Sequence, residues 1–485
     1  MKLPANKTKI VCTIGPASES LDTMEQMIRA GMSVARLNFS HGDFAGHKKV
    51  IENIRVAAKT TGRRVAIMAD LPGPKMRIGK LAEEPIELRS GDTFTLTTEE
   101  IIGDARHASV TFARLPQVVK PKDTLFLNDG IIQLEVVSAQ GPEVACRVLT
   151  GGELRSRKGL NLPGINLGIS AFTDHDRECL QFAAEQGVDA VSQSFVESAS
   201  DIVAVRKAAV DLGYHPFIIA KIERSRARDH IEAILDAADG IMVARGDLGV
   251  EIPVEKIPIA QKWLVRQANL WGKPVITATN MLESMTTSRR PSRAEATDVA
   301  NAILDGTDCV MLSGESAMGK YPVESVAMLA GIAEAIEPFR PAFGTRETLK
   351  AIVKEAQASL TDLIAYSVET TLEHIAPAAV VVPTRSGVTA RRITRFRLPV
   401  WVVAVSSQEA TCQHLQFSYG VYPVHEPDHP DDWSVYVREW LRAHEMEGRL
   451  VVLTEGPSAK RPDTNNRMEI IDLDAHKGAK RSSGG

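Results

Sequence analysis

The chain has 485 residues, which is too many for one hydrophobic core, so we expect about two to four domains. Its apolar content of 44% and charged content of 24% are those of a soluble globular protein, and its formal net charge of −4 gives no reason to expect a nucleic-acid partner. There is no apolar run of about 18 residues, no signal-peptide core and no CxxC pair among five scattered cysteines, so we expect a cytoplasmic protein without a membrane partner or a thiolate metal site.

The first segment alternates strands with amphipathic helices. Strands are predicted at residues 9–13, 33–38 and 64–70, and a helix follows each of the first two. The alternation stops at residues 71–74, because their sequence LPGP forms a turn that a central strand does not tolerate.

Residues 72–170 have a different character and predict an inserted all-β lid domain. The sequence Asn-Asp-Gly at residues 128–130 is a hairpin signal between two of its strands. Short β-type runs occupy residues 93–97, 109–112, 124–127, 131–137 and 144–149.

The alternation of strands and helices then resumes. Five further strands are predicted at residues 190–194, 217–221, 240–244, 274–277 and 309–311. Three strands before the insert and five after it give eight βα units, which indicates a closed (β/α)8 barrel built from residues 1–71 and 171–343. An open doubly wound sheet is the alternative, because periodicity does not prove closure.

The remaining residues, 344–485, predict a separate C-terminal α/β domain after a linker at 339–344. A helix is expected over residues 351–375. Strands are expected at residues 380–382, 401–405, 450–453 and 468–471.

Charged side chains follow the predicted strands at the point where each ends. Lys221 and Glu223 close one strand, and Arg245 and Asp247 close the next. Positions two apart on a strand point to one side, and ligands of parallel α/β folds bind at the carboxyl ends of the strands. Two carboxylates and a lysine there suit a divalent metal with a phosphate or enolate oxygen. Structural salt bridges at a barrel rim are the alternative.

Other polar residues follow the remaining strands. Because Gly246 has no side chain, an anion could reach the backbone N–H groups around it. The further candidates for the rim are Arg36, Asn38, Ser40, Asp70, Lys75, Arg77, Thr279 and Glu315. Such a set suits a phosphorylated, carboxylated substrate held by arginines and a metal.

Seven stretches of the chain resemble the signature motifs of the pyruvate kinase family. They run in that family's order and cover most of residues 7–325: KIVCTIGPAS, RLNFSHG, AKIE, ARGDLG, ATNMLESM, RPSRAEATDVANAILDG and LSGESAMGKYP. The resemblance implies a barrel with a mobile β lid, a C-terminal regulatory domain with allosteric control, and a homotetramer. It also implies transfer of the phosphoryl group of phosphoenolpyruvate to ADP, giving pyruvate and ATP, the last step of glycolysis.

The resemblance also assigns roles at the reacting atoms. Arg36 and Arg77 would hold the phosphoryl group during its transfer. Glu223 and Asp247 would ligate Mg²⁺ (or Mn²⁺), and Lys221 would neutralise the charge that develops on the bridging oxygen and the enolate. Phosphoryl transfer needs mainly positioning and charge neutralisation from the protein, which agrees with these assignments.

Further roles follow for the two ligands. The backbone around Gly246 and the hydroxyl of Thr279 would bind the substrate carboxylate together with Asp247, and Thr279, directly or through water, would help protonate C3 of the enolate. His41 and Lys158, with Arg77, match nucleotide contacts of the family.

One segment departs from the family's usual pattern. Asn38, Ser40, Asp70 and the position of Leu71 match the family's monovalent-cation ligands. Members that need K⁺ carry DTKGPE after the third strand, whereas this chain has DLPGPK, with Lys75 in place of the glutamate. A lysine ammonium supplies the +1 charge of a bound ion, so the chain resembles the potassium-independent branch and K⁺ is not expected to be required.

Two further features resemble family sites. Residues 384–389 follow a strand and open a helix, which makes a phosphate nest that resembles the family's effector site. Its candidate residues are Thr384, Arg385, Ser386, Gly387 and Thr389. The opposing loop, residues 455–466, lacks the family's spacing of glycines. Asp129 is either a turn residue or a neighbour of the nucleotide.

Two other function classes remain open from the residues alone. A barrel enzyme that acts on pyruvate or phosphoenolpyruvate by carbon–carbon chemistry could share the Glu/Asp metal pair, but it would need no nucleotide lid. A non-catalytic sensor could keep the barrel and act through the C-terminal site, but then Lys221, Glu223, Asp247 and Thr279 would have no reason to be intact.

Overall fold

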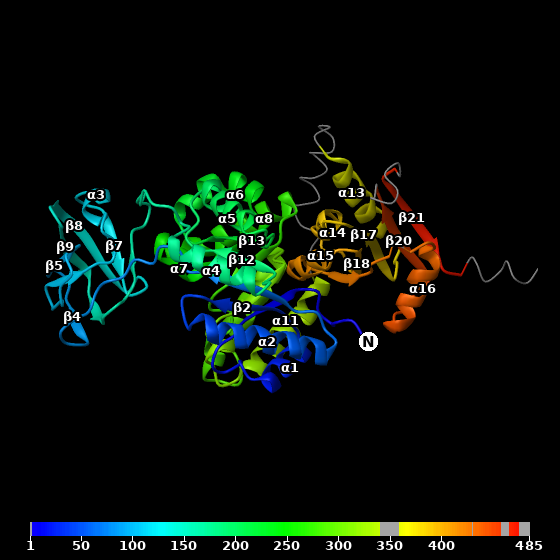
Figure 1. Ribbon diagram of the computed structural model, residues 1–485, viewed down its shortest axis with the longest axis horizontal. Coiled ribbons are helices and arrows are strands. Elements are labelled where there is room, and N and C mark those ends of the chain that lie inside the picture. Colours follow the sequence, from blue (N-terminus) through cyan, green and yellow to red (C-terminus); the bar gives the residue numbers. More distant parts are fainter. Residues whose placement is uncertain (1, 340–357, 429, 457–464, 475–485) are drawn as a thin grey trace, which may run out of the picture.

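The computed structural model describes residues 2–339, 358–428, 430–456 and 465–474. Three bodies lie along the long axis of the molecule, with a β-rich lid at one end, a barrel in the middle and an α/β domain at the other end (Figure 1). The boundary expected at residues 343 and 344 lies outside the described residues.

Eight parallel strands close into a barrel in the order β1-β16-β15-β14-β13-β12-β3-β2. They are β1 (Lys9–Thr13), β2 (Met32–Asn38), β3 (Ala66–Leu71), β12 (Ala190–Gln193), β13 (Phe217–Ile222), β14 (Gly240–Ala244), β15 (Val275–Ala278) and β16 (Cys309–Leu312). Each is buried along most of its length, which explains why their sequences are nearly continuous apolar runs. The predicted closed barrel is confirmed and the open sheet is wrong.

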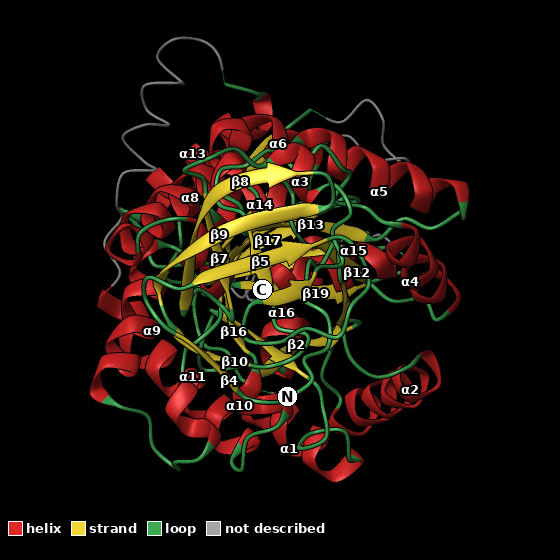
Figure 2. Cartoon of the chain, turned by 90° about the vertical axis from the view of Figure 1, so that its left-hand side faces the viewer, coloured by secondary structure: helices red, strands yellow, loops and turns green. Residues whose placement is uncertain are grey.

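Helices surround the barrel strands (Figure 2). They are α1 (Leu21–Ala30), α2 (Phe44–Thr61), α4 (Asp174–Glu185), α5 (Ala199–Asp211), α6 (Ile231–Ala237), α7 (Arg245–Glu251), α8 (Ile257–Trp271), α9 (Arg293–Asp305), α10 (Gly314–Ala317) and α11 (Pro322–Ile336). Local chemistry sets where they begin: Ser292 and Glu295 form a capping box at α9, and Pro322 opens α11.

The lid is a six-stranded sheet of order β11-β7-β8-β9-β5-β6 with a two-stranded ribbon of β10 and β4. Its elements are β4 (Ile86–Leu88), β5 (Thr93–Thr97), β6 (His107–Ser109), α3 (Leu115–Val118), β7 (Thr124–Leu127), β8 (Ile132–Gln140), β9 (Glu143–Thr150), β10 (Gly152–Leu154) and β11 (Leu160–Asn161). The sequence did not indicate β4, β10 or β11, because two or three residues are too few to show a period, and the run predicted at 109–112 is the strand at 107–109.

The C-terminal sheet has the order β19-β18-β17-β20-β21, and only the pairing of β20 with β21 is antiparallel. Its elements are α13 (Leu360–Leu372), β17 (Ala379–Pro383), α14 (Val388–Thr394), β18 (Trp401–Ser406), α15 (Glu409–His414), β19 (Val421–His425), α16 (Trp433–Ala443), β20 (Leu450–Glu455) and β21 (Arg467–Asp472). The sequence did not predict β19, which contains Pro423 and tolerates it because the strand lies at the edge of the sheet. The part of the helix expected at 351–357 lies outside the described residues.

The C-terminal domain closes the amino-terminal end of the barrel. Phe417 is fully buried in the apolar cluster inside the barrel, where its ring stacks on that of Phe217 with centroids 5.3 Å apart. Asp308, just before β16, pairs with Arg397 and accepts a hydrogen bond of 2.9 Å from the backbone N–H of Tyr419. Because this end of the barrel is plugged, the opposite end is the one open to ligands.

Replacing Phe417 with alanine is expected to cost about 3–5 kcal/mol of unfolding free energy, the usual cost of deleting a buried aromatic ring. The matched control is Phe339→Ala, since Phe339 is 77% exposed and its loss is expected to change stability by less than about 0.5 kcal/mol. The midpoints of denaturant unfolding measure both effects. Equal midpoints for the two variants would show that the ring does not hold barrel and domain together.

Candidate active site

Asp70 lies at the centre of a buried cluster at the carboxyl end of the barrel strands. Its carboxylate accepts hydrogen bonds from Nε and Nη2 of Arg36, the first of 3.0 Å, and from Oγ of Ser192 at 2.7 Å. Nζ of Lys221 lies 3.2 Å from Oδ1 of Asp70. Asp70 is only 2% exposed and Lys221 only 8%. Two cations therefore share one carboxylate in a place with little access to water.

Lys221 also joins this cluster to Glu223, two residues further along the chain. Nζ of Lys221 lies 2.9 Å from Oε1 of Glu223 and donates a hydrogen bond of 2.7 Å to Oγ of Ser194. The other carboxylate oxygen of Glu223 accepts a hydrogen bond of 2.7 Å from the backbone N–H of Phe195. Asp247 lies in the first turn of α7 and is half-buried.

Burial and neighbouring charges shift the pKa values of Asp70, Lys221 and Glu223. Burial alone would raise the pKa of Asp70, but Lys221 and Arg36 hold it well below its usual range. Burial lowers the pKa of Lys221, but Asp70 and Glu223 together raise it above its usual value. Burial raises the pKa of Glu223, Lys221 opposes that rise, and the charge of Asp247 adds to it. Glu223 and Asp247 thus repel each other, which is the electrostatic setting that a shared cation relieves.

The donor set fits a metal that is shared with a substrate. Within the described ranges, no group of three or more His, Cys, Asp or Glu side chains could hold a metal ion. Mg²⁺ commonly takes one or two protein carboxylates and completes its shell with water and substrate phosphate oxygens. Glu223 and Asp247 match that pattern, whereas a permanent structural metal would need more ligands from the protein.

Thr279 follows β15 in a strained conformation. Its φ of +67° is rare for a β-branched residue. Its Oγ1 accepts a hydrogen bond of 2.8 Å from the backbone N–H of Gly246 and donates one of 2.7 Å to the carbonyl oxygen of Ala278. The guanidinium of Arg245 donates to the carbonyl oxygens of Ala278 and Thr279 at 3.2 and 2.6 Å. A strained backbone that its surroundings hold in place is typical of a functional site.

Lys75 lies beside residues predicted to hold a monovalent cation. Its Nζ donates a hydrogen bond of 2.8 Å to Oγ of Ser40, and the backbone N–H of Ser40 donates one of 3.1 Å to Oδ1 of Asn38. The side chain of Leu71 is a hydrocarbon and has no oxygen to offer an ion. It is fully buried in β3. Partial desolvation lowers the pKa of Lys75, and the charge of Lys221 lowers it further. An ammonium group is therefore held next to Ser40 and Asn38.

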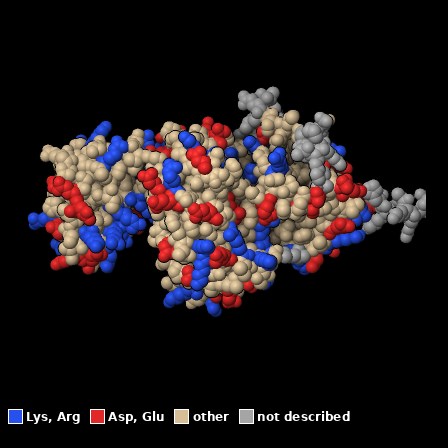
Figure 3. All heavy atoms as spheres, in the orientation of Figure 1, with Lys and Arg blue, Asp and Glu red and all other residues tan. Residues whose placement is uncertain are grey.

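The residues predicted to bind the nucleotide lie near the junction of barrel and lid. Arg77 pairs with Gly159 in an isolated bridge between the two lid linkers, next to Lys158, and its Nη1 donates a hydrogen bond of 3.2 Å to the carbonyl oxygen of Arg157. Burial lowers the pKa of His41, as do nearby cations that include Arg77. Basic side chains gather on the side of the lid that is turned toward the barrel (Figure 3).

Asp129 lies in the turn between β7 and β8, where its φ is +56°. A side chain placed on Gly159 would begin 3.8 Å from Oδ1 of Asp129, so this carboxylate lies near the residue that follows Lys158 in the chain. Its role at the nucleotide stays a prediction.

The predicted effector residues form a turn between β17 and α14, remote from the barrel rim. Oγ1 of Thr384 accepts a hydrogen bond of 2.9 Å from the backbone N–H of Gly387, whose φ is +79°. Arg385 and Ser386 are exposed and Thr389 is half-buried. The opposing loop, apart from its first two and last two residues, lies outside the described residues.

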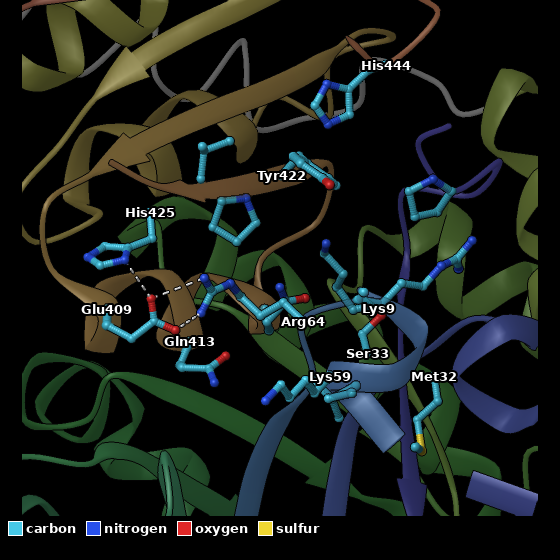
Figure 4. A pocket seen from close by; sticks show the side chains of 18 of the residues that line it. Lys9, Met32, Ser33, Lys59, Arg64, Glu409, Gln413, Tyr422, His425 and His444 are labelled. Carbon is cyan, nitrogen blue, oxygen red and sulfur yellow. Dashed lines mark hydrogen bonds and ion pairs between the residues drawn. The ribbon is translucent and has the colours of Figure 1, made fainter. Parts of the chain in front are cut away.

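A cavity of about 870 Å³ lies between the barrel and the C-terminal domain (Figure 4). Its lining includes Ser33 of the barrel and Tyr422 of the C-terminal domain. Across it, Nη2 of Arg64 donates a hydrogen bond of 3.1 Å to Glu409, which also lies 3.2 Å from Nδ1 of His425. None of the residues predicted for the reaction lines this cavity, so it is not part of the candidate active site.

Sequence reasoning missed several residues that support the site. Ser192 and Ser194 bind Asp70 and Lys221, and Thr13 accepts a hydrogen bond of 2.8 Å from Nη1 of Arg36. The serines stand two apart at the end of a predicted strand, the same spacing as Lys221 and Glu223, and this signal could have identified them. Thr13 gave no such signal, because its partner lies 23 positions further along the chain.

Comparison with known proteins gives matches over nearly the whole chain. The family model described as pyruvate kinase, barrel domain, matches residues 5–326, and the one described as pyruvate kinase, alpha/beta domain, matches residues 362–471. A pyruvate kinase of Thermococcus litoralis is 48% identical over 476 residues, covering 98% of this chain and all of its own. A pyruvate kinase of Geobacillus stearothermophilus is 46% identical, covering 96% of this chain and 80% of its own. The crystal structure of a pyruvate kinase from Cryptosporidium parvum superposes with a TM-score of 0.89 at 34% identity, covering 97% of this chain and 96% of its own.

Replacing Asp70 with asparagine is expected to destabilise the protein by about 3–5 kcal/mol, because Arg36 and Lys221 would be left buried beside a neutral group. Ser192→Ala is the matched control: it removes one hydrogen bond to the same carboxylate and should cost about 1.5–3 kcal/mol at most. Denaturant unfolding at neutral pH measures both. A smaller loss for Asp70→Asn than for Ser192→Ala would show that the two cations do not depend on this charge.

Proposed function

We propose a division of roles for the residues of the barrel rim, starting from the fact that the chain belongs to the pyruvate kinase family. Its reaction is the transfer of the phosphoryl group of phosphoenolpyruvate to ADP, which gives pyruvate and ATP in the last step of glycolysis. Matches to both domains favour this phosphotransferase over the carbon–carbon enzyme and the non-catalytic sensor. The observation that supports the assignment of residues is the buried cluster of Asp70, Lys221 and Glu223, with Asp247 near enough for its charge to raise the pKa of Glu223.

Glu223 and Asp247 would hold a divalent ion, Mg²⁺ or Mn²⁺. When bound, such an ion would act as a Lewis acid and neutralise part of the negative charge of the substrate. Support for this role comes from the mutual repulsion of the two carboxylates and from the hydrogen bond that fixes Glu223 to Phe195.

Arg36 and Arg77 would position the phosphoryl group. A terminal oxygen of ADP attacks phosphorus, the bond from phosphorus to the enol oxygen breaks, and that oxygen keeps the electron pair. Nζ of Lys221 would face the enol oxygen as it becomes negative. Its raised pKa keeps it cationic, and the contacts to Asp70 and Glu223 keep the ammonium in place before the substrate arrives.

Gly246 and Thr279 would bind the substrate carboxylate at the start of α7. The backbone N–H of Gly246 donates a hydrogen bond to the hydroxyl oxygen of Thr279, so this N–H points to a place that an oxygen acceptor can occupy. Thr279, directly or through water, would then help deliver the proton that C3 of the enolate takes up. His41, Arg77 and Lys158 would contact the nucleotide.

Lys75 would replace the monovalent cation of potassium-dependent relatives. Its ammonium donates to Ser40 beside Asn38, two of the residues that match the family's ion ligands, and Asp70 is the third. This position supports assignment to the potassium-independent branch, with K⁺ not required.

Three broader expectations stay proposals. The turn at 384–389 would bind a phosphorylated effector and so make the enzyme allosteric, a proposal that rests on its backbone turn and its exposed Arg385. The protein would act as a homotetramer in the cytoplasm. Among the described helices, none has the length and apolarity that crossing a bilayer demands.

Replacing Lys221 with methionine should lower kcat by about 10²–10³-fold, the usual effect of removing one electrostatic stabiliser. Lys273→Met is the matched control, because the ammonium of Lys273 donates to the carbonyl oxygen of Ala238 at the closed end of the barrel. Steady-state assays with phosphoenolpyruvate, ADP and Mg²⁺ measure both variants. A kcat for Lys221→Met within about tenfold of the wild type would show that Lys221 does not take part in the chemical step.

The wild-type enzyme should be nearly fully active in K⁺-free buffer, because Lys75 supplies the positive charge. Lys75→Glu should make activity depend on added KCl, whereas Lys80→Glu, a change at an exposed lysine of the same linker, should not. Rates are compared with and without KCl at constant ionic strength. A rise of about tenfold or more in the wild type on adding KCl would contradict the role of Lys75.

A further inference from the structure

Arg224 is a buried arginine with no role in the reaction described so far. It directly follows Glu223 in the chain, and only 2% of the residue is exposed. A guanidinium in such a place needs several partners, because removing its charge from water is costly. Those partners come from three different parts of the molecule.

Two of its partners are carboxylates of the barrel. Nη2 lies 3.1 Å from Oε1 of Glu197, in the segment after β12, and Nη1 lies 3.5 Å from Oε1 of Glu251, the last residue of α7. The other oxygen of Glu251 accepts hydrogen bonds of 3.2 Å from both the backbone N–H and Oγ of Ser225. The side chain of Glu251 is 1% exposed, so its charge depends on Arg224 and Ser225.

The third partner belongs to the second linker of the lid. Nη2 of Arg224 donates a hydrogen bond of 2.7 Å to the carbonyl oxygen of Ile165. The side chain of Ile165 packs against the apolar core of the lid, which includes Leu162. The same short segment therefore touches the lid core with its side chain and the barrel with its carbonyl group.

Helix α7 contacts the lid at a second point as well. Its first turn carries Gly246 and Asp247, and its last turn carries Val250 and Glu251. A side chain built on Gly130, in the turn between β7 and β8, would begin 3.4 Å from Cγ2 of Val250. The lid thus contacts the last turn of α7 directly, at Gly130. The second lid linker is connected to the same turn through Arg224.

We propose that Arg224 is a positioning residue that ties the second lid linker to α7. It thereby fixes the position of the lid residues that bind the nucleotide relative to the first turn of α7, which binds the substrate. This inference rests on the proposed roles of Asp247, Gly246 and Lys158. A planar guanidinium suits the task because its separate N–H groups reach a carboxylate and a carbonyl oxygen in fixed directions, whereas a lysine ammonium is a single point. Arg224 need not touch substrate, since it acts through Ile165 and Glu251.

The test compares Arg224→Lys with Glu197→Gln. Lysine keeps the positive charge that Glu251 needs but cannot hold Glu251 and Ile165 together. KM for ADP should therefore rise about fivefold to tenfold, the effect of one lost hydrogen bond, while KM for phosphoenolpyruvate changes by less than about twofold. Glu197→Gln removes a partner that lies in the barrel alone, and it should leave both KM values as in the wild type. A residue that only stabilised the fold would lower the melting temperature without separating the two KM values.

Hydrogen–deuterium exchange of the free protein provides a readout without substrate. Amides of residues 162–168 should exchange faster in Arg224→Lys than in the wild type and in Glu197→Gln. Because this measurement needs no activity, it reports on the linker even if the proposed roles in phosphoryl transfer fail.

A double variant covers the case in which the single change does not fold. Arg224→Met with Glu251→Gln removes both buried charges at once, so neither is left unpaired, and it should raise KM for ADP in the same selective way and speed up linker exchange. The proposal is overturned if linker exchange is unchanged in the folded variant, if KM for ADP stays within about twofold of the wild type, or if Glu197→Gln has the same effects.

Discussion

The shared burial of Asp70 between Arg36 and Lys221 is the constraint on which the rest of the site depends. A carboxylate so deeply buried would be neutral if it were alone, and either cation would be costly to bury without it. The three residues come from β2, β3 and β13, and β2 and β3 lie next to each other while β12 separates β3 from β13. The order of these four neighbouring strands brings all three ends to one part of the barrel rim, so the strand order places the charge cluster.

The two ends of the barrel have different roles, one in stability and the other in the proposed chemistry. Phe417 and the ion pair of Asp308 with Arg397 close the barrel interior at its amino-terminal end, so this end contributes stability, and the cavity beside it holds none of the residues predicted for the reaction. The other end holds the charge cluster and the strained Thr279, whose cost must be met by packing elsewhere. The lid adds cationic groups at that same end, and it does so from linkers that begin and end on the barrel.

Much of this arrangement could be predicted from the sequence, because a buried parallel strand has a recognisable apolar run and its polar end follows at once. Lys221, Glu223 and Asp247 were found in this way. Partners without such a local signal could not be found: Thr13 accepts a hydrogen bond from Arg36, which lies 23 positions further along the chain, and no local pattern reports such a contact. Short strands such as β4 and β11, and the edge strand β19 with its proline, were missed because propensity is weak where tertiary pairing decides the structure.

The balance of charge at the rim supports the proposal that an ammonium replaces an ion there. In the proposed arrangement, Arg36, Lys75, Arg77 and Lys221 face the carboxylates of Asp70, Glu223 and Asp247, and a divalent ion adds two further positive charges. The resulting excess is close to the roughly three negative charges that a carboxylate and a phosphate group carry together at neutral pH. A glutamate in place of Lys75 would lower the total by two, and a bound monovalent cation would restore only part of it. The lysine keeps the full total with one covalently fixed charge, whose occupancy does not depend on the salt in solution.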